Sequence, residues 1–190
     1  VTGALLATGD QTMTDLPAPA RMPKGPECLE AYREAADGLL SAFEGLDPSD
    51  PKPTFAGPGS AGWWMRRQAQ EVSVHRIDAQ DGIRAAGGPS PDPLAVDGAA
   101  DGIDEWAQMF VAQRMPQRGA VLPPDLHGRT LHIHGTDDPV PADGAEWLLT
   151  VTDEGVVTVE ATHAKGDVAL RGPAETLLLD PNGRIEHAIR

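Results

Sequence analysis

The stretch "RRQAQEVSVHRIDAQ", residues 66–80, decides the fold, and it places a glutamate and a histidine four residues apart. Its pattern predicts a helix over about residues 60–84, with Ser60 as the N-cap. On a helix, residues four apart lie about one turn apart on the same face. Glu71 and His75 are therefore placed to share a ligand.

A carboxylate and an imidazole together are suitable ligands for a divalent metal such as zinc. Asp78 follows His75 by three residues on nearly the same stripe, where its carboxylate could hold a ring nitrogen of the ligand. The alternative is that Glu71 pairs with Arg67 and that His75 is a satisfied core residue. Two ligands do not complete a zinc site, so a further histidine or acid must come from elsewhere.

Proline and glycine divide the first two thirds of the chain into helices and loops. Apolar residues recur with a helical period in 27–46 and again in 97–115, while 15–26 and 47–60 are predicted to be loops. Residues 1–118 are therefore predicted to form a helical domain without strands.

From about residue 128 the period changes to the alternation of strands. Strands are predicted within 129–138, 145–155 and 156–172, and a short helix over 172–180. An Asp-Glu-Gly turn predicts a hairpin between two of these strands. The predicted class is α+β, with a helical domain at 1–118 followed by a small α+β domain at 128–190.

The remaining histidines offer a second set of metal ligands. His132 and His134 are two residues apart, so on a strand they point to the same face and could clip a metal. The alternative is that their imidazoles lie at a domain interface. His127 and His163 are predicted to be isolated, and His187 lies in an acidic tail.

The net charge of −14 and the pI near 4.6 argue against nucleic acid and against anionic membranes as partners. The acidity favours a soluble protein that meets small molecules or other proteins, or simply a solvated acidic surface. A single cysteine, Cys28, excludes an intrachain disulfide and fits a reducing cytoplasm. No apolar run approaches the length of a membrane span.

The stretch "FAGPGSAGWWMRRQAQEVSVHRIDAQ" (55–80) resembles the pattern W-x-R-R-x-x-x-E-[TS]-x-V-H-R-x-D-A of the actinobacterial mycothiol-dependent maleylpyruvate isomerase family. "DPLAVDGAADGIDEW" (92–106) is similar to the next helix of that family. "LHIHGTDDP", "AEWLLTVTDEGV" and "HAKGDVALRGPAETLLL" are similar to its C-terminal domain. The resemblance extends over nearly all of residues 27–179.

The resemblance implies a DinB-like helical domain with a catalytic metal, usually taken as zinc. Glu71 and His75 match two of the family's ligands, and a third, a histidine, comes from an earlier helix. No histidine precedes His75 in this sequence. We therefore expect a chain that is truncated at its N-terminus, with "VTGALLATG" as the end of a second helix. The end, "DPNGRIEHAIR", also departs from the family pattern.

The resemblance further implies mycothiol as a thiol cofactor and a small-molecule substrate. A metal-bound thiol loses its proton, so it could add to the double bond of a cis dicarboxylate, allow rotation and leave the trans isomer. Relatives are expected to transfer thiols to other electrophiles. Arg171 matches a family position at which it could hold a substrate carboxylate, or it is a strand-to-helix corner residue. The alternatives are a non-catalytic metal- or small-molecule-binding stress-response module with the same fold, and an inactive gene product.

Overall fold

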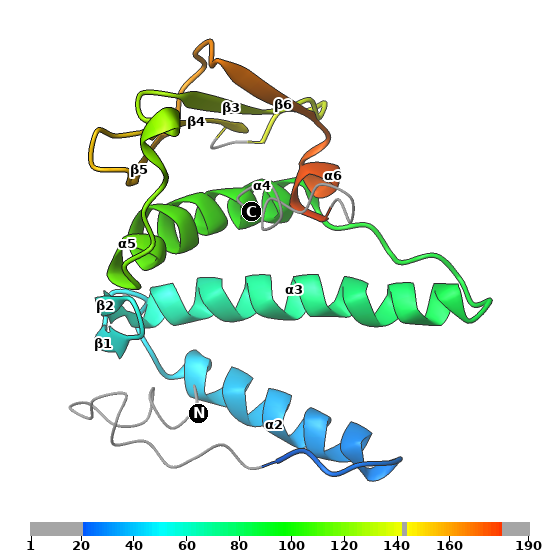
Figure 1. Ribbon diagram of the computed structural model, residues 1–190. Coiled ribbons are helices and arrows are strands. Elements are labelled where there is room, and N and C mark those ends of the chain that lie inside the picture. The colour runs from blue at the N-terminus through cyan, green and yellow to red at the C-terminus, as the bar shows by residue number, and fades with distance from the viewer. Residues whose placement is uncertain (1–20, 142–143, 180–190) are drawn as a thin grey trace. The chain divides into compact units, whose positions relative to one another are not determined.

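The structure is a computed structural model that describes residues 21–141 and 144–179 (Figure 1). The chain divides into two compact units, Val1–Ala69 and Gln70–Arg190, and the division falls within one long helix. We describe each unit by itself. The predicted helix end at "VTGALLATG" and the acidic tail with His187 lie outside the described residues.

The first unit contains a helix, a β-hairpin and the beginning of the long helix. Its elements are α2 (Glu27–Glu44), β1 (Pro51–Thr54), β2 (Gly57–Ser60) and the start of α3 (Ala61–Ala85). The helices confirm the predictions at 27–46 and 60–84. The backbone N–H of Trp63 donates to the Ser60 hydroxyl at 3.3 Å, which confirms the predicted N-cap.

The hairpin contradicts the prediction that 47–60 is a loop and that strands occur only after residue 128. β1 and β2 pair antiparallel, and the Thr54 hydroxyl closes their turn by donating to the carbonyl of Gly57 at 2.7 Å. Prolines lack an N–H, but each strand of a two-stranded ribbon has one outward edge where none is needed. A proline-rich segment can therefore form this short ribbon.

Aromatic residues hold the first unit together. Trp64 is buried, and its indole N–H donates to the carbonyl of Pro53 at 3.0 Å. Phe55 and Trp63 meet Trp64 edge to face, with ring centroids 5.8 and 4.8 Å away. The hairpin is therefore fixed against the first turn of α3, where the helix begins.

The helices of the second unit include one continuous run of three segments. This run consists of α4 (Val96–Glu105), the π-helix η2 (Trp106–Arg114) and α5 (Met115–Gln117). The other helical elements of the unit are the rest of α3, the 3₁₀ turn η3 (Pro124–Leu126) and α6 (Ala174–Leu179). The run from α4 to α5 confirms the helix predicted over 97–115.

The sheet of the second unit has four strands in the order β5-β4-β3-β6. They are β3 (Thr130–Gly135), β4 (Glu146–Val151), β5 (Val157–Glu160) and β6 (Val168–Gly172). β4 is antiparallel to both β3 and β5, whereas β6 is parallel to β3. The predicted hairpin between β4 and β5 is confirmed, with Gly155 at a φ of 73° in its turn.

One face of the sheet packs on helices. The shared core is made of buried side chains from α4, η2 and α6, of alternate residues from β3, β4 and β5, and of the residue before β4: Ala99, Ala100, Ile103, Val111, Ala174, Ile133, Trp147, Leu149, Val157 and Ala145. Helices cover this face of the sheet (Figure 1). The predicted α+β class is confirmed, while the domain boundary between residues 118 and 128 stays a prediction.

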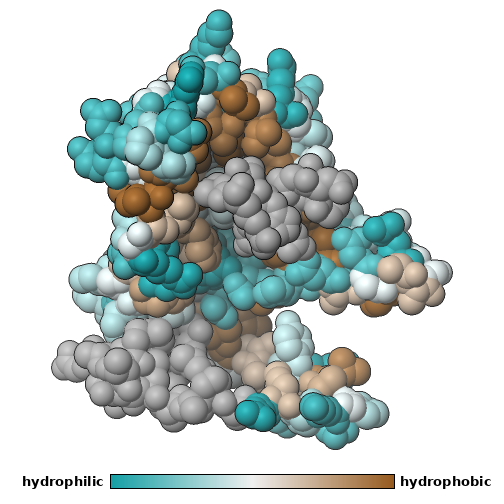
Figure 2. All heavy atoms as spheres, viewed as in Figure 1, coloured by the Kyte–Doolittle hydropathy of each residue, from teal (hydrophilic) through white to brown (hydrophobic). Residues whose placement is uncertain are grey.

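Hydrophilic side chains alternate with smaller apolar patches on the face of the molecule drawn in Figure 2. None of the helices in the described ranges combines the length and the apolar character that crossing a membrane requires.

Candidate functional sites

Glu71, His75 and Asp78 form a contiguous polar group on α3. The His75 Nε2 lies 3.1 Å from Glu71 Oε1, and its Nδ1 lies 3.1 Å from Asp78 Oδ2. The two carboxylates thus hold the imidazole from both sides. The prediction that Glu71 and His75 share one helix face is confirmed.

The three side chains are exposed, with 65% of His75, 50% of Glu71 and 41% of Asp78 accessible. The hydrogen bond with Asp78 raises the pKa of His75, and this outweighs the opposing effect of partial burial. Attraction by Glu71 adds to the increase. The alternative that His75 is a core residue is wrong.

A neighbouring face of α3, which is anchored by buried residues, fixes the orientation of Glu71, His75 and Asp78. Gln70 is buried, and its amide donates to Asp101 Oδ2 at 2.6 Å and to the carbonyl of Gly98 at 3.2 Å. Ile77, two turns further along, is also buried. Because positions 70 and 77 lie on one stripe, the positions of Glu71 and His75 are turned about a third of a circle away from it.

Arg171 lies on β6 and is exposed. In the parallel pairing of β3 with β6, its Cα partner is His134. Paired residues of neighbouring strands point to the same face, so Arg171 lies on the face of the sheet that is opposite the core. Its predicted contact with a substrate carboxylate stays a prediction.

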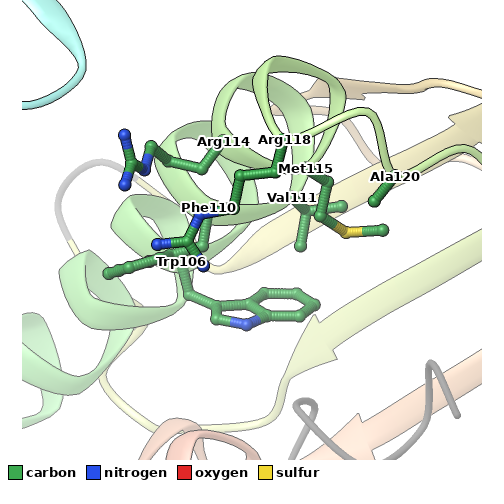
Figure 3. Close-up of a pocket in the computed structure, with 7 residues that line it drawn as sticks. All are labelled: Trp106, Phe110, Val111, Arg114, Met115, Arg118 and Ala120. Atoms are coloured by element: carbon green, nitrogen blue, oxygen red, sulfur yellow. The ribbon is translucent and has the colours of Figure 1, made fainter.

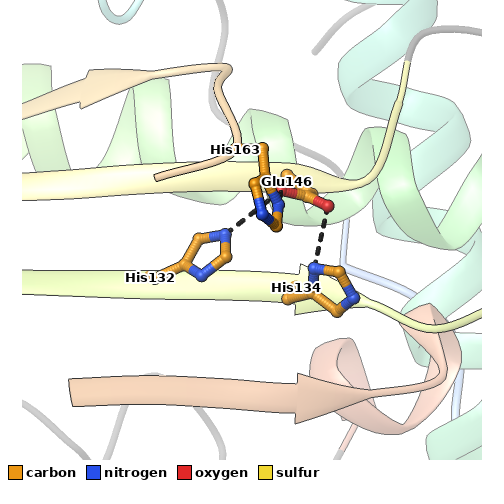
Figure 4. A group of neighbouring side chains, drawn as sticks. All are labelled: His132, His134, Glu146 and His163. Carbon is orange, nitrogen blue, oxygen red and sulfur yellow. Dashed lines mark hydrogen bonds and ion pairs between the residues drawn. The ribbon is translucent and has the colours of Figure 1, made fainter. Parts of the chain in front are cut away.

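That open face of the sheet carries a cluster of three histidines around one glutamate. His134 Nδ1 lies 2.8 Å from Glu146 Oε1, and His132 Nε2 lies 3.3 Å from Glu146 Oε2. His163 Nδ1 also contacts Glu146 Oε2. Figure 4 shows the three rings converging on the carboxylate. The prediction that His163 is isolated is wrong.

The buried neighbours of these residues explain their orientation. Ile133 is fully buried between His132 and His134, so strand alternation puts both imidazoles on the open face. Trp147 is buried in the core, and its indole N–H donates to Asp104 Oδ1 at 3.0 Å. Glu146 therefore points to the open face, opposite His134 in the antiparallel register.

The connection between β5 and β6 brings the third histidine to the cluster. Because the strand order is β5-β4-β3-β6, residues 161–167 must cross β4 and β3 to reach the far edge. Gly166 packs directly on the backbone of His132. Beyond it, Asp167 Oδ2 accepts hydrogen bonds from the Thr130 N–H and hydroxyl at 2.8 and 2.9 Å. These contacts hold the connection that carries His163.

The electrostatics of the cluster favour an ionised glutamate. Burial alone would raise the pKa of Glu146, but the hydrogen bond from His163 and the attraction of His134 and His163 outweigh it and lower that pKa. The accessible side-chain fraction rises from 9% in His132 and 21% in His134 to 77% in His163. The cluster is thus closed toward the sheet and open at His163.

Sequence reasoning identified His132 and His134 but missed Glu146 and His163. The signal for Glu146 was its place beside Trp147, since a tryptophan in the core forces its neighbours to the other face. His163 lies in a connection whose path depends on the strand order, and local patterns do not give that order.

The described residues also form a pocket of about 360 Å³ on η2 and α5. Figure 3 shows the guanidinium groups of Arg114 and Arg118 toward the end of the pocket away from Met115 and Ala120. Apolar surface with neighbouring guanidinium groups suits a small organic anion. Its lining consists of Trp106, Phe110, Val111, Arg114, Met115, Arg118 and Ala120.

A family model described as the mycothiol maleylpyruvate isomerase N-terminal domain matches residues 4–80. No curated protein and no solved structure matches the chain. The matched segment includes both Glu71 and His75, the pair that the structure holds 3.1 Å apart on α3. Residues 4–80 are thus similar to this domain, which supports a relationship of the chain to the mycothiol maleylpyruvate isomerase family.

Proposed function

We propose that this protein is a metal-dependent, mycothiol-dependent isomerase or thiol transferase, and that Glu71 and His75 are two of its metal ligands. The observation that carries the proposal is the coincidence of the family match with the geometry of α3. The matched residues contain a carboxylate oxygen and an imidazole nitrogen 3.1 Å apart, both exposed. The single cysteine and acidic composition fit a cytoplasmic enzyme.

The residues present fit a divalent ion of the zinc type, which accepts histidine nitrogen and carboxylate oxygen. Such an ion, when bound, would supply the acidity that deprotonates a thiol near neutral pH. Asp78 holds the ring nitrogen of His75 that faces away from Glu71, which fixes the orientation of the imidazole and increases its basicity. A third protein ligand is required, and the family resemblance assigns it to an earlier helix.

Arg171 has the role of binding the substrate. A guanidinium group can hold a carboxylate through two parallel hydrogen bonds, which suits a dicarboxylate such as maleylpyruvate. Its exposed position on β6 leaves it accessible to a small anion.

The test is the loss of maleylpyruvate in the presence of mycothiol and Zn²⁺, followed by absorbance. Replacing Glu71 by Gln or His75 by Ala should abolish turnover, and Asp78→Asn should lower it by about 10- to 100-fold because the imidazole loses its support. Asp81→Asn is the matched control, since Asp81 carries a half-exposed carboxylate on the same helix and pairs with Arg84.

Thiol-dependent turnover that survives in both Glu71→Gln and His75→Ala would refute the proposed ligands. If the unmodified protein binds Zn²⁺ through these residues but turns over neither maleylpyruvate nor other electrophiles with mycothiol, the non-catalytic binding module is the correct function.

A further inference from the structure

We propose that His132, His134, Glu146 and His163 form a second metal site, on the open face of the C-terminal sheet, for a four-coordinate divalent ion of the zinc type. This site shares no residue with the pair Glu71 and His75. It therefore does not depend on the function proposed above.

Four donor atoms meet in a space of the right size. One ligand atom from each residue lies within 4.8 Å of all the others. Ligands at 2.0–2.2 Å around a tetrahedral zinc ion are about 3.4 Å apart, so no pair of donors needs to approach by more than about 1.4 Å. The rings are nearly perpendicular to one another, with interplanar angles between 65° and 86°. They therefore approach the common point from different directions.

The donor set suits zinc better than a hard cation. Three imidazole nitrogens and one carboxylate oxygen are ligands that zinc prefers, whereas Ca²⁺ and Mg²⁺ take oxygen. A neutral imidazole binds the ion through the lone pair of a ring nitrogen, and a carboxylate binds it through an oxygen. The protein's net charge of −14 further favours a bound cation.

The scaffold is preorganised for three of the four ligands. His132, His134 and Glu146 stand on paired strands whose alternate residues are fixed in the core. His163 reaches them from an exposed connection, and its side chain is 77% accessible. The ion would tie this connection to β3 and β4, and the His163 position is the one that an external ligand could displace.

The competing explanation is a network of hydrogen bonds in which one carboxylate accepts from three imidazoles and no metal binds. Titration of the metal-free protein with Zn²⁺ separates the two explanations, with Co²⁺ as a spectroscopic probe. The Glu71→Gln/His75→Ala double variant serves as the background, so any remaining site lies outside α3. We expect one equivalent of Zn²⁺ to bind, and four-coordinate visible absorption from Co²⁺.

Removal of His134 or His163 by replacement with alanine should weaken Zn²⁺ binding by at least about tenfold. His127→Ala is the matched control because His127 belongs to the same unit but not to the cluster, and it should bind as the background does. His163→Cys should keep a ligand and add a sulfur-to-Co²⁺ charge-transfer band, which reports the ion at this position. His163 is exposed, so its two variants should fold, and circular dichroism verifies the fold of every variant.

Failure of the background protein to bind Zn²⁺ would overturn the proposal. Equal affinity in His134→Ala, His163→Ala and the background would also overturn it, as would a His163→Cys protein without the sulfur band.

Discussion

Replacement of Gly166 by alanine should displace the connection that carries His163. A Cβ added at Gly166 would lie 2.8 Å from the backbone nitrogen of His132, 2.8 Å from the carbonyl oxygen of Val168 and 3.2 Å from the Cβ of His132. Two of these atoms belong to the backbone of the sheet, so they cannot rotate away. The connection must move by about 0.6 Å to reach the 3.4 Å at which ordinary contact begins.

This displacement is large compared with the tolerance of a metal site. Metal–ligand distances are held within about 0.2 Å, and His163 is three residues from the strained position. We expect the affinity for Zn²⁺ to fall by about 10- to 100-fold, the usual effect of disturbing the support of a ligand. Overpacking should also lower the free energy of unfolding by about 1–3 kcal/mol, which corresponds to a Tm lower by roughly 2–12 °C.

The assay is Zn²⁺ titration of Gly166→Ala beside thermal unfolding of the metal-free protein. Gly82→Ala is the matched control, since its Cβ would meet no atom within 4 Å and its place in α3 predicts a stability gain of up to about 1 kcal/mol. Wild-type affinity and Tm in Gly166→Ala would refute the packing argument. A lower Tm with unchanged Zn²⁺ affinity would refute the role of His163 as a ligand.

Two further predictions concern the strands that present the cluster. Trp147→Phe should lower the free energy of unfolding by about 1.5–3 kcal/mol in urea, because the charged acceptor Asp104 loses its indole donor; an unchanged midpoint would contradict this. Hydrogen bonds from the backbone and hydroxyl of Thr130 lower the pKa of Asp167. The ionised carboxylate therefore stabilises the folded protein above the ordinary pKa of an aspartate, and this contribution is lost as the pH falls through the lowered pKa. As the pH is lowered through this range, the urea midpoint should therefore decline more steeply in wild type than in Asp167→Asn. Parallel curves for the two proteins would contradict the stabilising role of Asp167.

The sequence predicted the features that depend on local spacing. The helical period of 66–80 and the glutamate-histidine spacing within it were sufficient to place Glu71 and His75 one turn apart on α3. The alternation of 129–138 likewise placed His132 and His134 on one face. In both cases the backbone geometry of a single element fixes the relation between the residues.

The sequence could not predict the features that depend on pairing between distant segments. Glu146 lies opposite His134 because of the register in which β3 and β4 pair. His163 lies beside these two residues because the connection from β5 to β6 crosses the sheet. The hairpin at 51–60 was missed for a related reason. Its prolines argue against a central strand, but they do not argue against an isolated ribbon held by Trp64.

Two proposed groups of metal ligands in one chain change the meaning of a metal titration. Zinc binding by the unmodified protein would not by itself support the site on α3, because the cluster on the sheet supplies four donors within 4.8 Å, whereas α3 supplies two principal ones. Affinity rises with the number of protein ligands that replace water, so the sheet should bind the first equivalent. The Glu71→Gln/His75→Ala protein should then keep that equivalent and lose only the thiol-dependent activity. The reverse result, loss of the tight equivalent with α3 altered, would assign the metal to the helix and leave the histidine cluster as a hydrogen-bond network.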